Sequence, residues 1–96
     1  MSAYLIANID VHDPDAYEAY RTRTPAIIER HGGRIIVRGG KVHMLEGQPW
    51  AHRMVVIEFP DVAAAQGFYD SPEYQEIIPL RTRASEGALL IVEGAD

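Results

Sequence analysis

The feature of this sequence that most constrains its fold is the order in which two hydrophobic periodicities follow each other. A β-patterned run is followed by a helical stretch, two more β-runs, a second helical region and a last β-run, at residues 4–11, 14–31, 34–46, 53–59, 61–78 and 88–93. This order predicts the α+β class and the split βαβ, or ferredoxin-like, plan, with one antiparallel sheet and its helices on one face. The other face of the sheet needs another cover. We therefore expect a homodimer in which a second copy covers it.

Length and composition limit the classes of protein to which the chain can belong. The 96 residues fit one ferredoxin-like domain over residues 1–96. The net charge of -5 argues against a nucleic-acid partner, because such binding rests on clustered lysine and arginine. The absence of cysteine excludes disulfides and thiolate chemistry. Because the sequence shows neither a signal-peptide pattern nor an apolar run that spans a bilayer, we expect a cytoplasmic location and no membrane partner.

The first helical stretch has clear start and stop signals. Asp13 is a suitable N-cap and Pro14 suits the first helical position. Gly32 and Gly33 supply a left-handed stop. Pro25 falls inside the helical pattern, where a missing N–H and a steric clash with the preceding turn predict a kink or a split.

The second helical region is predicted to be two helices. Asp61 caps a short helix that runs through Tyr69, and Ser71 with Pro72 starts another. Pro79 is expected to interrupt that helix, so that a loose turn leads into the last strand.

The pair Gly39 and Gly40 lies between two β-patterned segments, residues 34–38 and 41–46. It allows a two-residue hairpin turn or a bend within one long strand that then turns at residues 47–50. We prefer the bent strand, because a hairpin would add a fifth strand and disturb the split βαβ order.

An ordered series of short motifs runs along nearly the whole chain. It consists of Tyr4-Leu5-Ile6-Ala7, Asp13-Pro14-Asp15-Ala16-Tyr17, His31-Gly32-Gly33-Arg34, Val37-Arg38-Gly39-Gly40, Leu45-Glu46-Gly47, Val56-Ile57-Glu58-Phe59-Pro60 and Asp70-Ser71-Pro72-Glu73-Tyr74. In this series the chain resembles a bacterial family called domain of unknown function thirteen-thirty, within the dimeric α+β barrel superfamily. The resemblance implies a ferredoxin-like protomer whose open sheet faces pair into a barrel, and it implies no established activity. Relatives in that superfamily include cofactor-independent monooxygenases, lactone isomerases, stress-responsive proteins and haem enzymes.

Strand alternation divides the strand residues into two faces. The apolar face, expected to meet the helices, contains Leu5, Ala7, Ile9, Ile35, Val37, Val55, Ile57 and Phe59. The mixed face contains Tyr4, Asn8, Asp10, Arg34, Arg38, Met54, Val56 and Glu58. Two such mixed faces meeting in a dimer would partly desolvate their charged groups.

Three polar side chains of the mixed face are candidate site residues. Arg38 and Glu58 form either a structural ion pair or a ligand-contacting site. In a functional site Arg38 would bind an anionic or enolate oxygen, Glu58 would transfer a proton, and Asn8 would support substrate binding. We place any ligand site on these strand residues rather than on surface loops.

The four histidines do not have the spacing of a metal site, so no metal is predicted. His43 is a second candidate catalytic residue, because an imidazole that points into the barrel would act as a general base near neutral pH. A satisfied or exposed strand histidine is the alternative.

Aromatic residues of the two helical regions are predicted to gather. Tyr17 and Tyr20 lie on one stripe, and Phe68, Tyr69 and Tyr74 come from the second region. They form either plain core or the wall of a pocket between helices and sheet, in which Tyr17 and Tyr69 would contact substrate. Arg81 and Arg83 would close such a pocket or remain solvated.

Two functional classes follow from these residues. The first is a cofactor-independent enzyme that acts on a small apolar or aromatic anion. The second is a non-catalytic domain that binds a small ligand or only dimerises. No dinucleotide fingerprint or phosphate-binding glycine loop is present, so we expect no cofactor.

Overall fold

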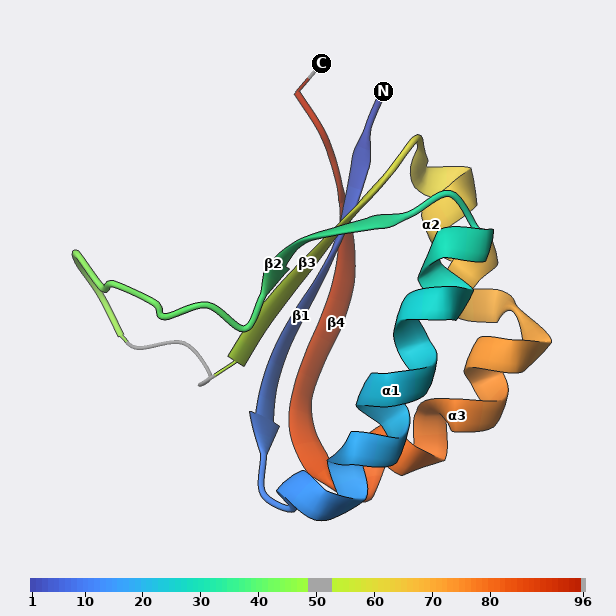
Figure 1. Ribbon diagram of the computed structural model, residues 1–96. Helices are drawn as coiled ribbons and strands as arrows, with labels where there is room; N and C mark the ends of the chain where they lie inside the picture. The colour runs from blue at the N-terminus through green and yellow to red at the C-terminus, as the bar shows by residue number, and fades with distance from the viewer. Residues whose placement is uncertain (49–52, 96) are drawn as a thin grey trace.

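The computed structural model describes residues 1–48 and 53–95, and it has the predicted ferredoxin-like order of elements. These elements are β1 (Ala3–Val11), α1 (Pro14–Arg30), β2 (Arg34–Arg38), β3 (Arg53–Phe59), α2 (Val62–Asp70), α3 (Pro72–Thr82) and β4 (Ser85–Glu93). The strands form one antiparallel sheet in the order β2-β3-β1-β4. All three helices cover the same face of this sheet (Figure 1). The α+β class is therefore confirmed.

The core lies between the sheet and the helices. Its largest fully buried side chains are Tyr74, Phe59, Phe68 and Ile77, and the buried residues of β1 alternate along the strand as predicted. The helix starts are also confirmed. Their caps are side chains of Asp13, Asp61 and Ser71, which accept hydrogen bonds from backbone N–H groups three residues later. None of the helices in the described part of the chain is long and apolar enough to cross a membrane.

Two prolines do not divide the helices in which they lie. Helix α1 continues through Pro25, and α3 continues through Pro79 to Thr82, so the predicted interruption at Pro79 is wrong. Buried side chains lie on both sides of Pro25, and Pro25 itself faces solvent. Tertiary packing of the helix therefore outweighs the local cost of each proline. Strand β4 begins at Ser85, earlier than the predicted start at residue 88.

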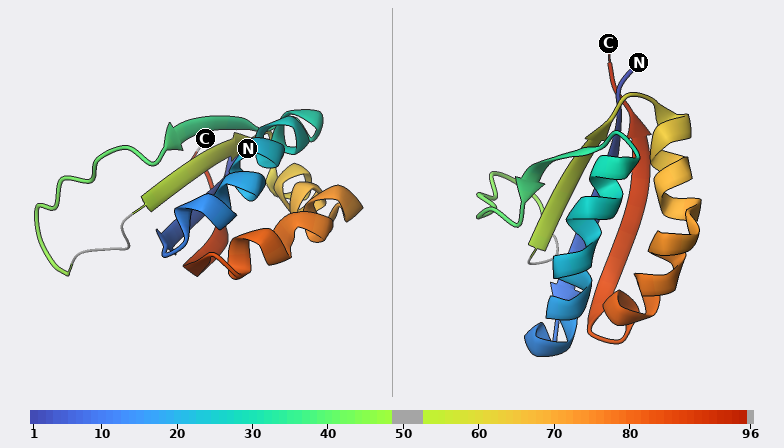
Figure 2. Two further views of the ribbon diagram at one scale, coloured as in Figure 1. Left: turned by 60° about the horizontal axis from the view of Figure 1, so that its bottom comes forward. Right: turned by 45° about the vertical axis from the view of Figure 1, so that its right-hand side comes forward.

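The predicted strand over residues 41–46 is not formed, so both interpretations of Gly39 and Gly40 are wrong. Strand β2 ends at Arg38, and residues 40–48 project from the sheet on the side away from the helices (Figure 2). We call residues 40–48 the arm. Among the described residues the arm pairs with no strand of its own sheet, and β3, which begins at Arg53, is paired with β2 and β1. Of the predicted turn at residues 47–50, positions 49 and 50 lie outside the described residues, as does His52.

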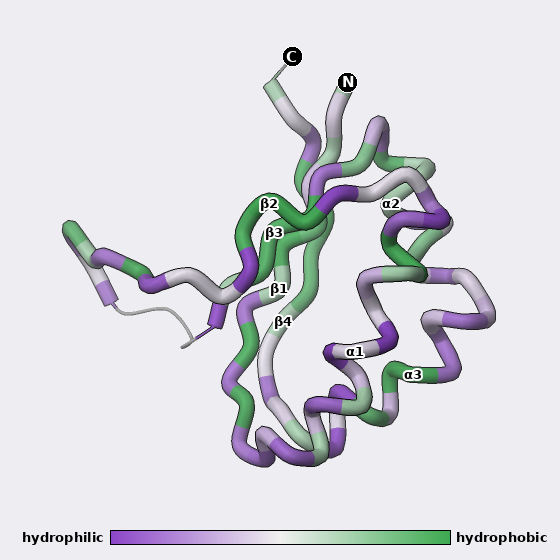
Figure 3. The backbone as a smooth tube through the Cα atoms, viewed as in Figure 1, coloured by the Kyte–Doolittle hydropathy of each residue, from purple (hydrophilic) through white to green (hydrophobic). Residues whose placement is uncertain are grey.

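The sheet face opposite the helices, called here the open face, is left uncovered. Its centre is apolar, with Ile6, Val56 and Leu90 side by side in the register of β3, β1 and β4. Hydrophobic segments follow these strands and also reach the tip of the arm, where Leu45 is 93% exposed (Figure 3). The exposed apolar surface of the open face and the arm is larger than single, scattered surface residues would produce.

Candidate functional site

A cavity of about 70 Å³ lies between α1 and the sheet. Its apolar wall comes from both layers and includes Leu5, Ala7, Ile9, Ile28, Val55 and Ile57. Its titratable lining consists of arginines and tyrosines, namely Tyr17, Tyr20, Arg21, Arg38, Arg53 and Tyr74. Among the described residues, no carboxylate or imidazole contributes to this lining. We call this space the helix-side cavity.

Arg38 reaches the helix-side cavity because β2 contains a one-residue bulge. Ile35 pairs with Ile57, but the next paired residue, Val37, lies opposite Val56, which leaves Ile36 as an extra residue. The alternation is therefore inverted beyond the bulge. Arg38 pairs with Val55 on the face toward the helices, and Val37 lies on the open face. The predicted faces of these two residues are wrong for this reason.

Arg53 is the second arginine at the cavity. It pairs with the buried Ile9, which places it on the helix side of β3. Its Nε atom is buried and has no hydrogen-bond partner among the described residues. A β-carbon added at Gly39 would lie 2.5 Å from Nη1 of Arg53, so the guanidinium rests against the glycine that ends β2. Asp10 and Arg53 also share an adjoining groove outside the cavity.

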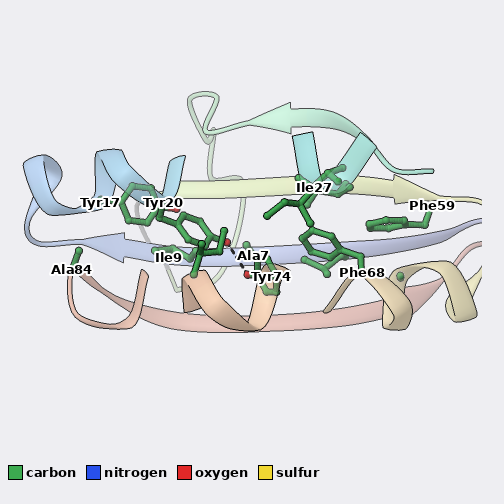
Figure 4. Close-up of a cluster of buried hydrophobic side chains, with 14 residues drawn as sticks. Ala7, Ile9, Tyr17, Tyr20, Ile27, Phe59, Phe68, Tyr74 and Ala84 are labelled. Atoms are coloured by element: carbon green, nitrogen blue, oxygen red, sulfur yellow. Dashed lines mark hydrogen bonds between the residues drawn. The ribbon is translucent and has the colours of Figure 1, made fainter. Parts of the chain in front are cut away.

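Three tyrosines, Tyr17, Tyr20 and Tyr74, line the cavity from the helices. The Tyr20 and Tyr74 hydroxyls lie 2.7 Å apart and share a hydrogen bond, drawn dashed in Figure 4. Burial raises the pKa of Tyr20, and the neighbouring Tyr74 raises it further. Burial also raises the pKa of Tyr17, and Arg53 opposes this shift. The Tyr17 and Tyr20 phenols, with raised pKa values, therefore stay neutral near pH 7.

The predicted aromatic cluster is present. Phe68 and Tyr74 have ring centroids 4.4 Å apart, and Tyr69 lies 5.8 Å from Tyr74. Tyr17 lines the helix-side cavity, whereas Tyr69 lines a separate groove beside β4 with Gln66. Of the two arginines expected to close a pocket, Arg81 lies 6.0 Å from the centre of the Tyr20 ring. Arg83 is exposed to solvent.

The other predicted site residues lie on the opposite side of the sheet. Glu58 accepts a hydrogen bond of 2.7 Å from Arg34 and is 3.4 Å from the Tyr4 hydroxyl, both across the open face. The predicted Arg38–Glu58 pair is therefore wrong. Asn8 also belongs to the open face, opposite Met54 and Ala88, and its Oδ1 atom is buried without a partner among the described residues.

His43 lies in the exposed arm, remote from the helix-side cavity by its place in the fold. The roles predicted for His43, Glu58 and Asn8 stay predictions. In residues 1–48 and 53–95, no three His, Cys, Asp or Glu side chains are grouped so as to hold a metal ion.

Arg53, Tyr20, Tyr74 and Arg21 line the cavity but were not among the predicted site residues. Arg53 has the same strand parity as Val55 and Ile57, so alternation alone places it on the helix face. Tyr20 was placed in the aromatic cluster, but its hydroxyl contact with Tyr74 depends on how α1 and α3 pack. Nothing in the local sequence marks the bulge that redirects Arg38.

Residues 2–95 match the family described as Domain of unknown function (DUF1330), and the chain belongs to this family. The comparison with curated proteins gives no match. The predicted resemblance is thus confirmed.

Several solved structures share the fold. A protein of unknown function from Rhodopseudomonas palustris, RPA0582, is 22% identical with a TM-score of 0.77, over 99% of this chain and 83% of that one. SnoaB, a cofactor-independent oxygenase from Streptomyces nogalater, is 16% identical with a TM-score of 0.64, over 99% of this chain and 94% of that one. A dimeric protein of unknown function and ferredoxin-like fold from Bacteroides fragilis is 16% identical with a TM-score of 0.58, over 97% and 96%.

The contact between Gly39 and Arg53 predicts different effects for the two adjacent glycines. Gly39 has φ of 67° and no room for a β-carbon, so Gly39→Val should lower the free energy of unfolding by about 1 to 3 kcal/mol. A β-carbon at Gly40 would have no atom within 4 Å, so Gly40→Val is the matched control, with a change within about 0.5 kcal/mol. Denaturant unfolding at equal protein concentrations measures both. Equal losses in the two variants would contradict the interpretation.

Proposed function

We propose that this protein is a homodimeric α+β barrel protein that binds a small aromatic or apolar anion in the helix-side cavity. The observation that carries the proposal is the position of Arg38 and Arg53 at an apolar, tyrosine-lined cavity. The buried Arg53 Nε has no hydrogen-bond partner among the described residues. A buried guanidinium donor without a partner is costly, and a bound anion would satisfy it with a charge-assisted hydrogen bond.

The chemistry of the cavity favours a ligand with an aromatic or apolar body. Its wall is mainly hydrophobic, and the polar groups that reach it are donors or cations at neutral pH. Arginine presents a planar fork of donors that matches a carboxylate. A volume of about 70 Å³ is below the roughly 150 Å³ of a cavity that holds benzene. A ring would therefore enter with movement of the long arginine side chains.

The open face supports the homodimer. Its exposed apolar residues include Val37, Leu90 and Val92, and the arm adds Met44 and Leu45. The unpartnered Asn8 Oδ1 on the same face would find donors in a second copy. The described dimeric protein from Bacteroides fragilis has the same fold. An interface of roughly 1,200 to 2,000 Å² is expected for a stable pair.

A charged residue at the centre of the open face should prevent the dimer from forming. Val56→Asp places a carboxylate between Ile6 and Val37, where two faces would exclude water. In sedimentation experiments at micromolar concentration, we expect the unchanged chain to be a dimer and the Val56→Asp variant to be a monomer. Val62→Asp is the control, because Val62 is exposed on α2. A monomeric unchanged chain would refute the proposed assembly.

Removal of one cavity arginine should weaken anion binding without dissociating the dimer. We expect Arg38→Ala and Arg53→Ala each to weaken benzoate binding by about 10- to 100-fold, the range for a hydrogen bond to a charged group. Arg83→Ala removes the same charge from an exposed position and serves as the control. Isothermal titration gives the affinities. Loss of thermal stability in Arg38→Ala and Arg53→Ala with unchanged benzoate affinity would make both arginines structural.

A second candidate is a cofactor-independent enzyme acting on the same class of anion. The resemblance in fold to SnoaB favours it, and the arginines and neutral phenols would stabilise an enolate or phenolate oxygen. The described cavity lining contains no carboxylate or imidazole to act as a base, so the substrate would enter as an anion. Mass spectrometry of an electron-rich hydroxybenzoate incubated with the protein in air tests this. Ligand recovered unchanged would exclude turnover of that probe and leave binding.

A further inference from the structure

The hydroxyl pair of Tyr20 and Tyr74 holds one more proton than its own hydrogen bond uses. The two oxygens are 2.7 Å apart, and the residues are 8% and 0% exposed. Two hydroxyls carry two protons, and only one proton can lie between the two oxygens. The hydrogen bonds of the described residues give neither hydroxyl a second partner. Whichever tyrosine donates, the other is left with a buried O–H group that needs an acceptor.

This unused donor belongs to residues that line the helix-side cavity. Buried hydroxyls nearly always have a partner, and a buried donor left without an acceptor destabilises the fold. Among the described residues that line the cavity, the only side-chain acceptors are the hydroxyls of Thr24 and the tyrosines. Thr24 donates to the Tyr20 carbonyl oxygen, at 2.6 Å, and neither hydroxyl of the pair donates to Thr24 among the hydrogen bonds of the described residues. An oxygen atom of a bound molecule is the acceptor that would complete the pair.

The donors of the cavity therefore come from two layers of the fold. Arg38 and Arg53 approach it from the sheet, on β2 and β3. Tyr20 and Tyr74 approach it from the helices, on α1 and α3. A molecule lying between sheet and helices would meet the two arginines on the sheet side and the neutral hydroxyl donor on the helix side, where Arg21 of α1 is already paired with Glu18. Such an arrangement recognises two different oxygen groups.

We propose that the Tyr20–Tyr74 pair determines ligand specificity: it donates a hydrogen bond to a hydroxyl or carbonyl oxygen of an aromatic carboxylate that Arg38 and Arg53 hold. This inference rests on the proposed function, because it needs an anion in the helix-side cavity. The ligand class is a hydroxy- or oxo-substituted aromatic carboxylate. The raised pKa of Tyr20 agrees with this role, because a neutral phenol donates and does not remove a proton at pH 7.

The test compares benzoate with its three monohydroxy derivatives by isothermal titration. We expect at least one hydroxybenzoate to bind the unchanged protein about 3- to 10-fold more tightly than benzoate, the worth of one neutral hydrogen bond. The decisive variant is the double substitution Tyr20→Phe with Tyr74→Phe, because a single one leaves a hydroxyl that can still donate. The double variant should bind benzoate and the hydroxybenzoates with equal affinity, because the donor that distinguishes them is gone. Removing both partners together leaves no unpaired group, which favours folding.

Tyr69→Phe is the matched control, since Tyr69 packs against Tyr74 but lines the separate groove beside β4. It should keep the preference for the hydroxylated ligand. A preference that persists in the double variant would overturn the inference, and so would equal binding of benzoate and all three derivatives by the unchanged protein. If none of the four compounds binds the unchanged protein, the proposed function itself is refuted.

A second comparison does not depend on whether the double variant folds. A formylbenzoate carries an acceptor oxygen where the corresponding methylbenzoate carries hydrogens, and the two molecules have similar size. The unchanged protein should prefer the formyl compound at the position at which it prefers a hydroxyl. Equal affinities for the two would mean that no protein donor reaches that position, and the inference would fail.

Discussion

The one-residue bulge in β2 is the constraint on which the site depends. Residues before it follow the register of an uninterrupted strand, so Arg34 reaches Glu58 across the open face. Beyond Ile36 each side chain changes face, and Arg38 turns toward the helices. Without the bulge, Val37 would fill the cavity wall and Arg38 would join the open face. One inserted residue therefore adds the positive charge of Arg38 to the cavity and the apolar side chain of Val37 to the open face.

The cavity also depends on how the end of β2 meets the start of β3. Gly39 donates its N–H to the Met54 carbonyl oxygen at 2.8 Å and, lacking a β-carbon, lets the Arg53 guanidinium lie against it. The chain then leaves the sheet as the arm. The backbone feature that ends the strand is thus the one that orients Arg53. The residue that follows the end of β2, Gly39, therefore also positions a side chain of the candidate site.

Local signals predicted the parts of the fold that local chemistry controls. The three helix caps and the alternation of β1 follow from neighbouring residues, and the structure confirms them. Pro79 was misjudged because packing of α3 outweighs its local cost. The arm was misjudged because a β-patterned segment still needs a pairing strand. In the candidate site, strand alternation alone would have placed Arg53 on the helix face. It could not have placed Arg38, because a bulge depends on how two strands pair and not on the sequence of one.

The buried polar atoms without partners among the described residues fall on two sides of the sheet, and this division matches the two proposals, assembly and ligand binding. Asn8 Oδ1 lies on the open face, whereas Arg53 Nε lies on the helix side, as does Arg81 Nε on α3. An acceptor on the open face calls for a donor, and donors in the cavity call for an acceptor. In the proposed dimer a second copy would cover the open face over a broad apolar surface. In the proposed site a small oxygen-bearing molecule would supply the acceptor in the cavity between α1 and the sheet.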